Sequence, residues 1–145
     1  MKRITALLYH AFTALDALGP LEVLGRLPGY EIRYASFSGG PVSNEKGLVV
    51  MTEALSSPGP GDILLIPGGM GSRQLVLQDD FLAALRKAAL ESTVVMTVCT
   101  GSALAAAAGL LDGLHATGNK RAFDWTMSMG KKVLWQRDAR WTRDG

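Results

Sequence analysis

The sequence predicts an α/β fold in which helices cover both faces of a mainly parallel sheet. Short apolar runs alternate along the chain with segments of helical periodicity, and this alternation is typical of βα units with right-handed crossovers. The chain has 145 residues, 48% of them hydrophobic and 19% charged, which fits one packed domain. We therefore expect a single three-layered domain over residues 1–145.

The first half of the chain supplies three expected strands and one helix. Residues 4–9 form an apolar run typical of a strand, and residues 31–37 alternate between apolar and polar side chains. Between them, residues 20–27 have apolar side chains at helical spacing, with Pro20 suited to a first helical turn. A short strand is expected over residues 48–51.

The second half begins with a continuous apolar run at residues 62–66, which a glycine-rich turn at 67–71 follows. Residues 79–91 are amphipathic and have carboxylates in the first turn, so they predict a helix. The β-branched run at 93–98 predicts a strand that is buried on both faces. The small residues at 103–108 predict a helix that lies flat on the sheet.

The last part of the chain predicts smaller elements. Gly109 ends the small-residue helix, and Asn119 is a candidate cap for a helix over 120–129. Two late edge strands are expected at 132–135 and 140–142.

Composition excludes several classes of protein. The net charge is +2, and the small basic excess after residue 120 indicates a solvated face rather than a nucleic-acid site. No apolar run approaches the roughly 20 residues that cross a bilayer. The first nine residues resemble a signal peptide in their charge, but His10 and Asp16 interrupt the apolar stretch and no cleavage site follows. With Cys99 as the single cysteine, we expect a cytoplasmic protein without a disulfide, a metal or another cofactor.

Cys99 is the strongest candidate for a catalytic residue. It stands between an expected strand and an expected helix, with Gly101 two positions on. A strand–nucleophile–helix turn needs small neighbours and exposes the nucleophile above the sheet. A helix N-terminus also lowers the pKa of a thiol, so we expect a reactive thiolate. The alternative is a cysteine that only fills space in the core.

A thiolate needs a group that moves protons. Asp16 lies in a mostly apolar loop, where a carboxyl group tends to have a raised pKa and can donate or accept a proton near neutrality. A helix cap is the alternative role for Asp16. His10 follows the first strand and can approach the site, whereas His115 fits a short edge strand and a structural or surface role.

The glycine turn has more than one interpretation. Gly68 and Gly69 are expected to expose backbone N–H groups toward Cys99 as an oxyanion hole. A tight turn that needs positive φ is the simpler alternative. Gly69 and Gly71 also match the start of a dinucleotide fingerprint, but Gln74 occupies the third glycine position, and no phosphate-loop lysine is present.

Several motifs in order resemble the ThiJ/PfpI superfamily, which is class I glutamine amidotransferase-like. They are FTALDALGPLEVL at 12–24, LIPGG at 65–69, VCTGS at 98–102 and AAGLL at 107–111, and they are most similar to the isonitrile hydratase branch. The resemblance implies a flavodoxin-like sandwich that forms a homodimer and acts on a small-molecule substrate. It also implies that Cys99 is the nucleophile, that Asp16 and Thr100 assist it, and that water is added to an isonitrile without a cofactor.

The sequence departs from this superfamily at three places. Thr100 occupies the position where the protease-like and deglycase-like branches have histidine, which argues against those activities. Residues 116–120 read ATGNK rather than the typical ATTHW, which leaves the substrate open. Relatives continue into a long closing helix beyond the residue that matches Gly145, so the domain is expected to be short at its C-terminal end.

Two other functions fit the same resemblance. One is a non-catalytic sensor that binds a small ligand. The other is a redox-responsive or chaperone-like protein in which Cys99 is oxidised.

Overall fold

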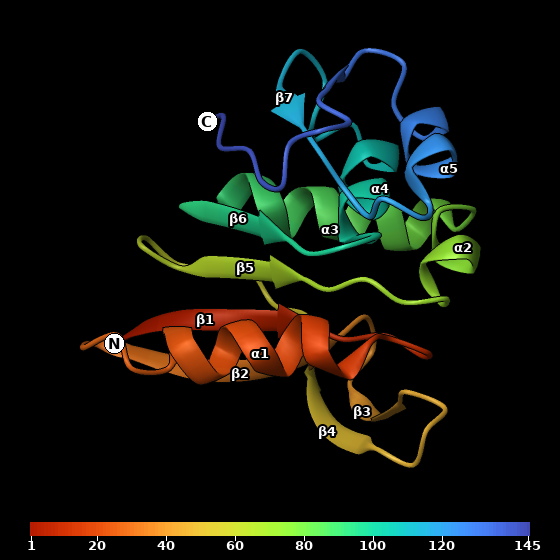
Figure 1. Cartoon of the computed structure of the whole chain (residues 1–145). Coiled ribbons are helices and arrows are strands. Elements are labelled where there is room, and N and C mark those ends of the chain that lie inside the picture. Colours follow the sequence, from red (N-terminus) through yellow and green to blue (C-terminus); the bar gives the residue numbers. More distant parts are fainter.

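A six-stranded sheet forms the centre of the molecule, as the computed structural model of residues 1–145 shows (Figure 1). The strand order is β3-β4-β2-β1-β5-β6. All neighbours are parallel except β3 and β4, which pair antiparallel. The strands are β1 (Lys2–Leu7), β2 (Tyr30–Ser36), β3 (Gly40–Ser43), β4 (Val49–Ala54), β5 (Ile63–Ile66) and β6 (Val94–Thr97).

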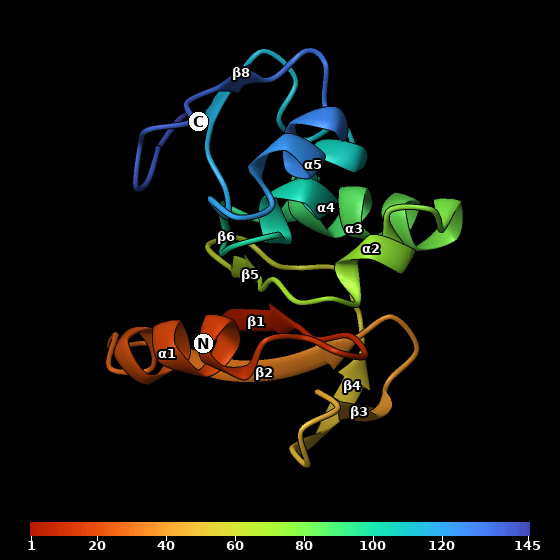
Figure 2. The same cartoon turned by 45° about the vertical axis from the view of Figure 1, so that its right-hand side comes forward.

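Helices flank this sheet, which confirms the α/β class. In Figure 1, α1 lies in front of the sheet and α3 lies behind it. The smaller ladder of β7 and β8 lies with α5 beyond the β6 edge, as Figure 2 shows from a second direction. The remaining elements are α1 (Ala14–Leu24), α2 (Ser72–Leu75), α3 (Asp79–Glu91), α4 (Gly101–Ala107), β7 (His115–Ala116), α5 (Phe123–Ser128) and β8 (Leu134–Trp135).

The hydrophobic core is centred on β1 and β5 and on the helices packed against them. Ile4, Leu65 and Leu104 are fully buried in it. Strand β5 is paired on both sides, and its continuous apolar sequence is buried on both faces. Strand β6 differs, since it pairs only with β5. Val94 and Val95 are 45% and 38% exposed, so the expectation that this strand is buried on both faces is wrong.

Helix α1 begins earlier than the sequence predicts. It starts at Ala14, so Pro20 lies inside the helix rather than in its first turn. Contacts with the glycine turn hold the residues just before helix α1 in place. Thr13 donates its N–H to the carbonyl of Gly68, and Phe12 forms a β-bridge with Gly69. This early start places Asp16 in the first turn of α1.

The structure differs from the sequence prediction in two further ways. It contains two elements that the sequence does not predict, strand β3, which is short, and helix α2, which is a single turn. Two predicted elements are also absent or shorter. Residues 140–142 form no strand. The helix predicted over 120–129 covers only Phe123–Ser128, and Asn119 stabilises the turn before it by accepting a hydrogen bond from the N–H of Ala122.

The carboxyl ends of β1, β5 and β6 lie at one edge of the sheet, where their arrowheads point in Figure 1. In open α/β sheets, ligands bind beyond this edge. None of the helices combines the length and the hydrophobicity that crossing a bilayer requires.

Candidate active site

Cys99 occupies a sharp turn between β6 and α4. Its φ is +56°, which lies in the left-handed region that few residues other than glycine adopt. The turn is held by hydrogen bonds from the N–H of Gly101 to the carbonyl of Val98 and from the hydroxyl of Ser102 to the carbonyl of Cys99. A Cβ at Gly101 would lie 2.1 Å from the carbonyl oxygen of Ile66, so this position requires glycine. The predicted strand–turn–helix geometry is therefore present at Cys99, with the backbone strain that functional sites often hold.

Asp16 and Cys99 meet on either side of Gly68. The N–H of Gly68 donates to Oδ2 of Asp16 at 3.2 Å. A Cβ at Gly68 would lie 2.7 Å from the Cβ of Cys99 and 2.9 Å from Oδ2 of Asp16. The absence of a side chain at Gly68 thus allows the carboxylate of α1 to approach the cysteine that follows β6.

Thr100 contacts the glycine turn. Its hydroxyl oxygen is 3.0 Å from the N–H nitrogen of Gly69, which donates to it, and 3.1 Å from Oγ of Ser72. Ser72 donates to the carbonyl of Gly69 at 2.6 Å. The N–H of Gly68 is paired with Asp16 and that of Gly69 with Thr100, and the arrangement fixes the turn beside Cys99. Neither N–H therefore points unpaired toward Cys99, as the expected oxyanion hole would require.

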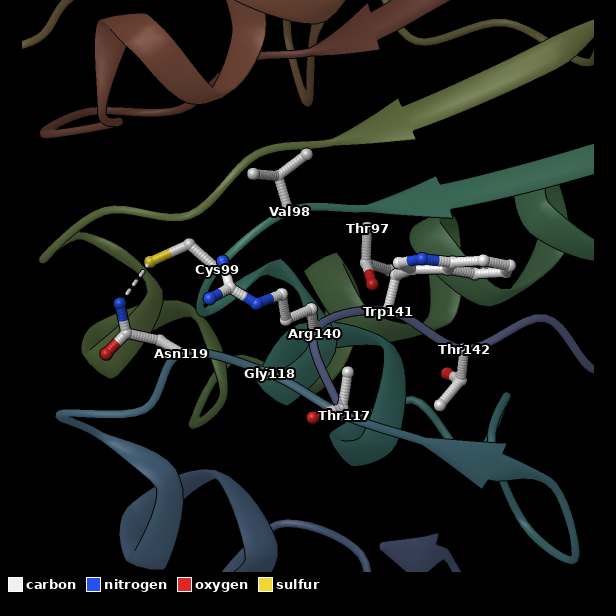
Figure 3. Close-up of a pocket in the computed structure, with 9 residues that line it drawn as sticks. All are labelled: Thr97, Val98, Cys99, Thr117, Gly118, Asn119, Arg140, Trp141 and Thr142. Carbon is white, nitrogen blue, oxygen red and sulfur yellow. Dashed lines mark hydrogen bonds between the residues drawn. The ribbon is translucent and has the colours of Figure 1, made fainter. Parts of the chain in front are cut away.

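The sulfur of Cys99 has a partner that the sequence analysis missed. Nδ2 of Asn119 donates a hydrogen bond to Sγ at 3.0 Å (Figure 3). Oδ1 of the same side chain accepts from the N–H of Ala122. Gly118 allows the close approach of this segment, because a Cβ there would lie 2.4 Å from Oγ of Ser102. The signal in the sequence is the polar residue that precedes an expected helix, and this pattern by itself predicts only a cap.

Burial and charge raise the pKa of the Cys99 thiol. Desolvation is the largest cause, and the carboxylate of Asp16 adds to it, whereas the N–H of Thr100 and the amide of Asn119 act in the opposite direction. The expectation of a pKa lowered by the helix N-terminus is therefore wrong. The N–H of Thr100 at the start of α4 lowers the pKa, but desolvation and the Asp16 carboxylate outweigh it.

The Asp16 carboxyl has a raised pKa as well, as the sequence analysis expected. Desolvation by burial is the main cause, and hydrogen bonds from Gly68 and Cys99 counteract part of it. The Asp16 carboxylate disfavours the negative charge of a Cys99 thiolate, whereas the Cys99 thiol stabilises the carboxylate through a hydrogen bond, so the pair tends to keep one proton, on the sulfur. Burial, Cys99 and Asp16 also raise the pKa of Tyr9, which stays protonated and donates to the carbonyl of Pro67 at 2.7 Å.

A pocket of about 220 Å³ opens on Cys99 from the side of Asn119 (Figure 3). It brings together the end of β6, the segment after β7 and the last part of the chain. Its lining residues are Thr97, Val98, Cys99, Thr117, Gly118, Asn119, Arg140, Trp141 and Thr142.

Neither histidine lines this pocket. His10 is exposed, and its Nε2 is 2.9 Å from Oε1 of Glu45, in a separate depression bordered by Met70 and Arg73. His115 is also exposed and pairs with Asp144. Of His10, His115 and Asp16, only the Asp16 carboxyl hydrogen-bonds to Cys99. No cluster of three or more His, Cys, Asp or Glu side chains is placed to bind a metal ion.

Comparisons with known proteins agree with this geometry. The model of the DJ-1/PfpI family matches residues 2–144. Isonitrile hydratase from Pseudomonas putida is 32% identical over 129 residues, which cover 88% of this chain and 57% of that protein. Deglycase PfpI from Pyrococcus furiosus is 29% identical over 92 residues, or 61% of this chain and 55% of the deglycase.

A solved structure extends the likeness to three dimensions. The structure of a ThiJ/PfpI family protein from Pseudomonas syringae superposes with a TM-score of 0.84 at 28% identity, over 99% of this chain and 59% of the other. The chain thus spans less than two thirds of the length of these three relatives.

Proposed function

The chain belongs to the DJ-1/PfpI family, and from this premise we propose that it is a cysteine enzyme that adds water to an isonitrile and needs no cofactor. The observation that carries the proposal is the approach of Asp16 to Cys99 across Gly68. A strained cysteine beside a carboxyl with a raised pKa supplies a nucleophile and a group that transfers its proton. The resemblance to isonitrile hydratase gives the substrate class.

The raised pKa of Cys99 defines how the first step proceeds. Because the thiol is protonated at neutral pH, its proton must leave as the sulfur attacks. The Asp16 carboxylate accepts this proton while Sγ bonds to the isonitrile carbon, and the proton then passes to the same carbon. The product of this step is a thioimidate, in which the former isonitrile carbon carries one hydrogen and the sulfur.

Water completes the reaction. Asp16 takes one proton from water as the water oxygen adds to the thioimidate carbon, and this proton passes to the nitrogen. The remaining hydroxyl proton then passes to Sγ as the carbon–sulfur bond breaks. One isonitrile and one water give one N-substituted formamide, and the thiol is regenerated. Asn119 donates to the sulfur and so stabilises negative charge on it as the bond breaks.

The raised pKa of Cys99 and the position of Thr100 also help to judge two alternative functions, a redox response and deglycation. Cysteines that sense oxidants are exposed and have lowered pKa values, whereas Cys99 is half-buried with a raised one, which disfavours a redox response. Thr100, in place of the histidine of the deglycase-like branch, contacts the glycine turn, which favours hydration over deglycation.

The proposal is tested by measuring formamide formation from an alkyl isonitrile. The variants Cys99→Ser and Asp16→Asn are expected to lose turnover, the latter by about a hundredfold or more, as for removal of a general base. Asp79→Asn is the matched control, because Asp79 also lies in the first turn of a helix but outside the site, and it is expected to retain full turnover. Undiminished turnover in Cys99→Ser would refute the mechanism. A native protein that binds isonitriles without hydrating them would instead indicate a ligand sensor.

A further inference from the structure

Arg140 gives the Cys99 pocket its charge. It is the one charged residue among those that line the pocket, and no carboxylate lies among them. In Figure 3 its guanidinium extends into the pocket on the side of Cys99. Arg3, Arg33 and Arg137 form ion pairs with acidic side chains, but Arg140 takes part in none of the ion pairs or side-chain hydrogen bonds of the structure.

The segment that carries Arg140 is fastened beside the active site. The carbonyl of Ala139 accepts a hydrogen bond from Oγ1 of Thr117 at 3.1 Å and another from Nζ of Lys120. Lys120 also donates to Oγ1 of Thr117 at 2.7 Å. Thr117 and Lys120 flank Asn119, the residue that bonds to the sulfur. Arg140 is therefore tied to the segment that contacts the nucleophile, and the ammonium of Lys120 adds a second positive charge nearby.

We propose that Arg140 binds a carboxylate of the substrate, so that the preferred substrate is an isonitrile that carries a carboxylate a few bonds from its reacting carbon. This inference rests on the proposed function. A guanidinium binds a carboxylate through two parallel hydrogen bonds, and an arginine without an acidic partner has these donors available. At about 30 Å³ per water molecule, 220 Å³ holds roughly seven water-sized groups, which suits a compact isocyano acid.

The experiment uses alkylation of Cys99, which does not depend on hydratase turnover. Iodoacetate and iodoacetamide have the same reacting carbon and similar size, but only iodoacetate carries a carboxylate. The rate of Cys99 alkylation by each reagent is measured by mass spectrometry in the native protein, in Arg140→Gln and in Arg143→Gln. Arg143 lies in the same part of the chain but outside the pocket, so it is the matched control.

The ratio of the iodoacetate rate to the iodoacetamide rate is expected to fall about fivefold in Arg140→Gln and to stay unchanged in Arg143→Gln. An exposed ion pair is worth up to about 1 kcal/mol, which corresponds to this factor. Thermal unfolding of each variant shows whether the fold is kept. Equal ratios in the native protein and Arg140→Gln would overturn the inference. If the native protein hydrates no isonitrile but Arg140→Gln still lowers the ratio of the iodoacetate rate to the iodoacetamide rate, the proposed function is wrong. The inference that Arg140 binds a carboxylate is then still supported.

Discussion

Replacement of Asn119 by aspartate is expected to slow alkylation of Cys99 by iodoacetamide by a factor of about five or more at pH 7.5. In the native site, Nδ2 of Asn119 donates to Sγ at 3.0 Å, and Oδ1 accepts from the N–H of Ala122 at 2.9 Å. Aspartate keeps the acceptor for Ala122, so the turn before α5 is retained. The sulfur loses its hydrogen-bond donor and gains a neighbouring negative charge, and both changes disfavour the thiolate.

The magnitude follows from these two changes. A hydrogen bond to a charged partner is worth ~1 kcal/mol more than one to a neutral partner. A carboxylate about 4 Å from the thiolate adds ~1 kcal/mol of repulsion at the dielectric constant of bulk water, and this value is a lower bound for a half-buried pair. The sum of at least ~2 kcal/mol lowers the thiolate population by a factor of about thirty or more. A more basic thiolate is also more nucleophilic, with a Brønsted coefficient near ~0.5, and this cancels about half of the effect on a logarithmic scale.

The assay is the rate of carbamidomethylation of Cys99 between pH 6 and 10, followed by intact mass. Asn44→Asp is the matched control, because Oδ1 of Asn44 also accepts from backbone N–H groups, those of Lys46 and Leu48, in a loop away from the pocket. The rate profile of Asn119→Asp is expected to move to higher pH, and that of Asn44→Asp to stay in place. If Asn119→Asp reacts as fast as the native protein throughout this range, Asn119 does not stabilise the thiolate.

Three further changes test the site and its support. Asp16→Asn removes a negative charge that raises the pKa of Cys99, so the alkylation profile is expected to move to lower pH, and a move to higher pH would contradict the pairing. Gly68→Ala places a Cβ 2.7 Å from that of Cys99 and is expected to cost about 1–3 kcal/mol in urea unfolding; an unchanged midpoint would mean that the site is looser than described. Burial alone raises the pKa of Asp62, but two backbone N–H groups and the Arg3 guanidinium outweigh it and lower the pKa. Asp62 therefore stabilises the fold above its unfolded pKa of about 3.9, and this contribution is lost as the pH falls through its lower folded value. Asp62→Asn is expected to cost about 3 kcal/mol at pH 7, with the difference from the native protein shrinking in acid, and a difference independent of pH would refute this origin.

Local patterns in the sequence were sufficient for the fold class and for part of the site. The run before Cys99 and the glycine after it predict the turn, because strand and helix signals are set by neighbouring residues. Asp16 was recognisable as an acid among apolar residues. The start of α1 was not predicted, because it is fixed by a hydrogen bond from Thr13 to the distant Gly68.

The remainder of the site depends on contacts between segments far apart in the chain. Asn119 lies 20 positions after Cys99 in the sequence, and its bond to the sulfur arises from how the segment after β7 packs on α4. Arg140 lines the pocket from a segment for which the sequence predicts an edge strand and in which the structure has none. The direction of the Cys99 pKa shift also required the fold, because burial and the approach of Asp16 outweigh the helix terminus that the sequence predicts.

The most direct test of the central claim is a titration of turnover against the fraction of Cys99 alkylated. Cys99 is the single cysteine of the chain, so intact mass reports this fraction without ambiguity. If Cys99 is the nucleophile that adds to an isonitrile, formamide formation should fall in proportion to the alkylated fraction and vanish at full modification. Turnover that persists in fully alkylated protein would contradict the account.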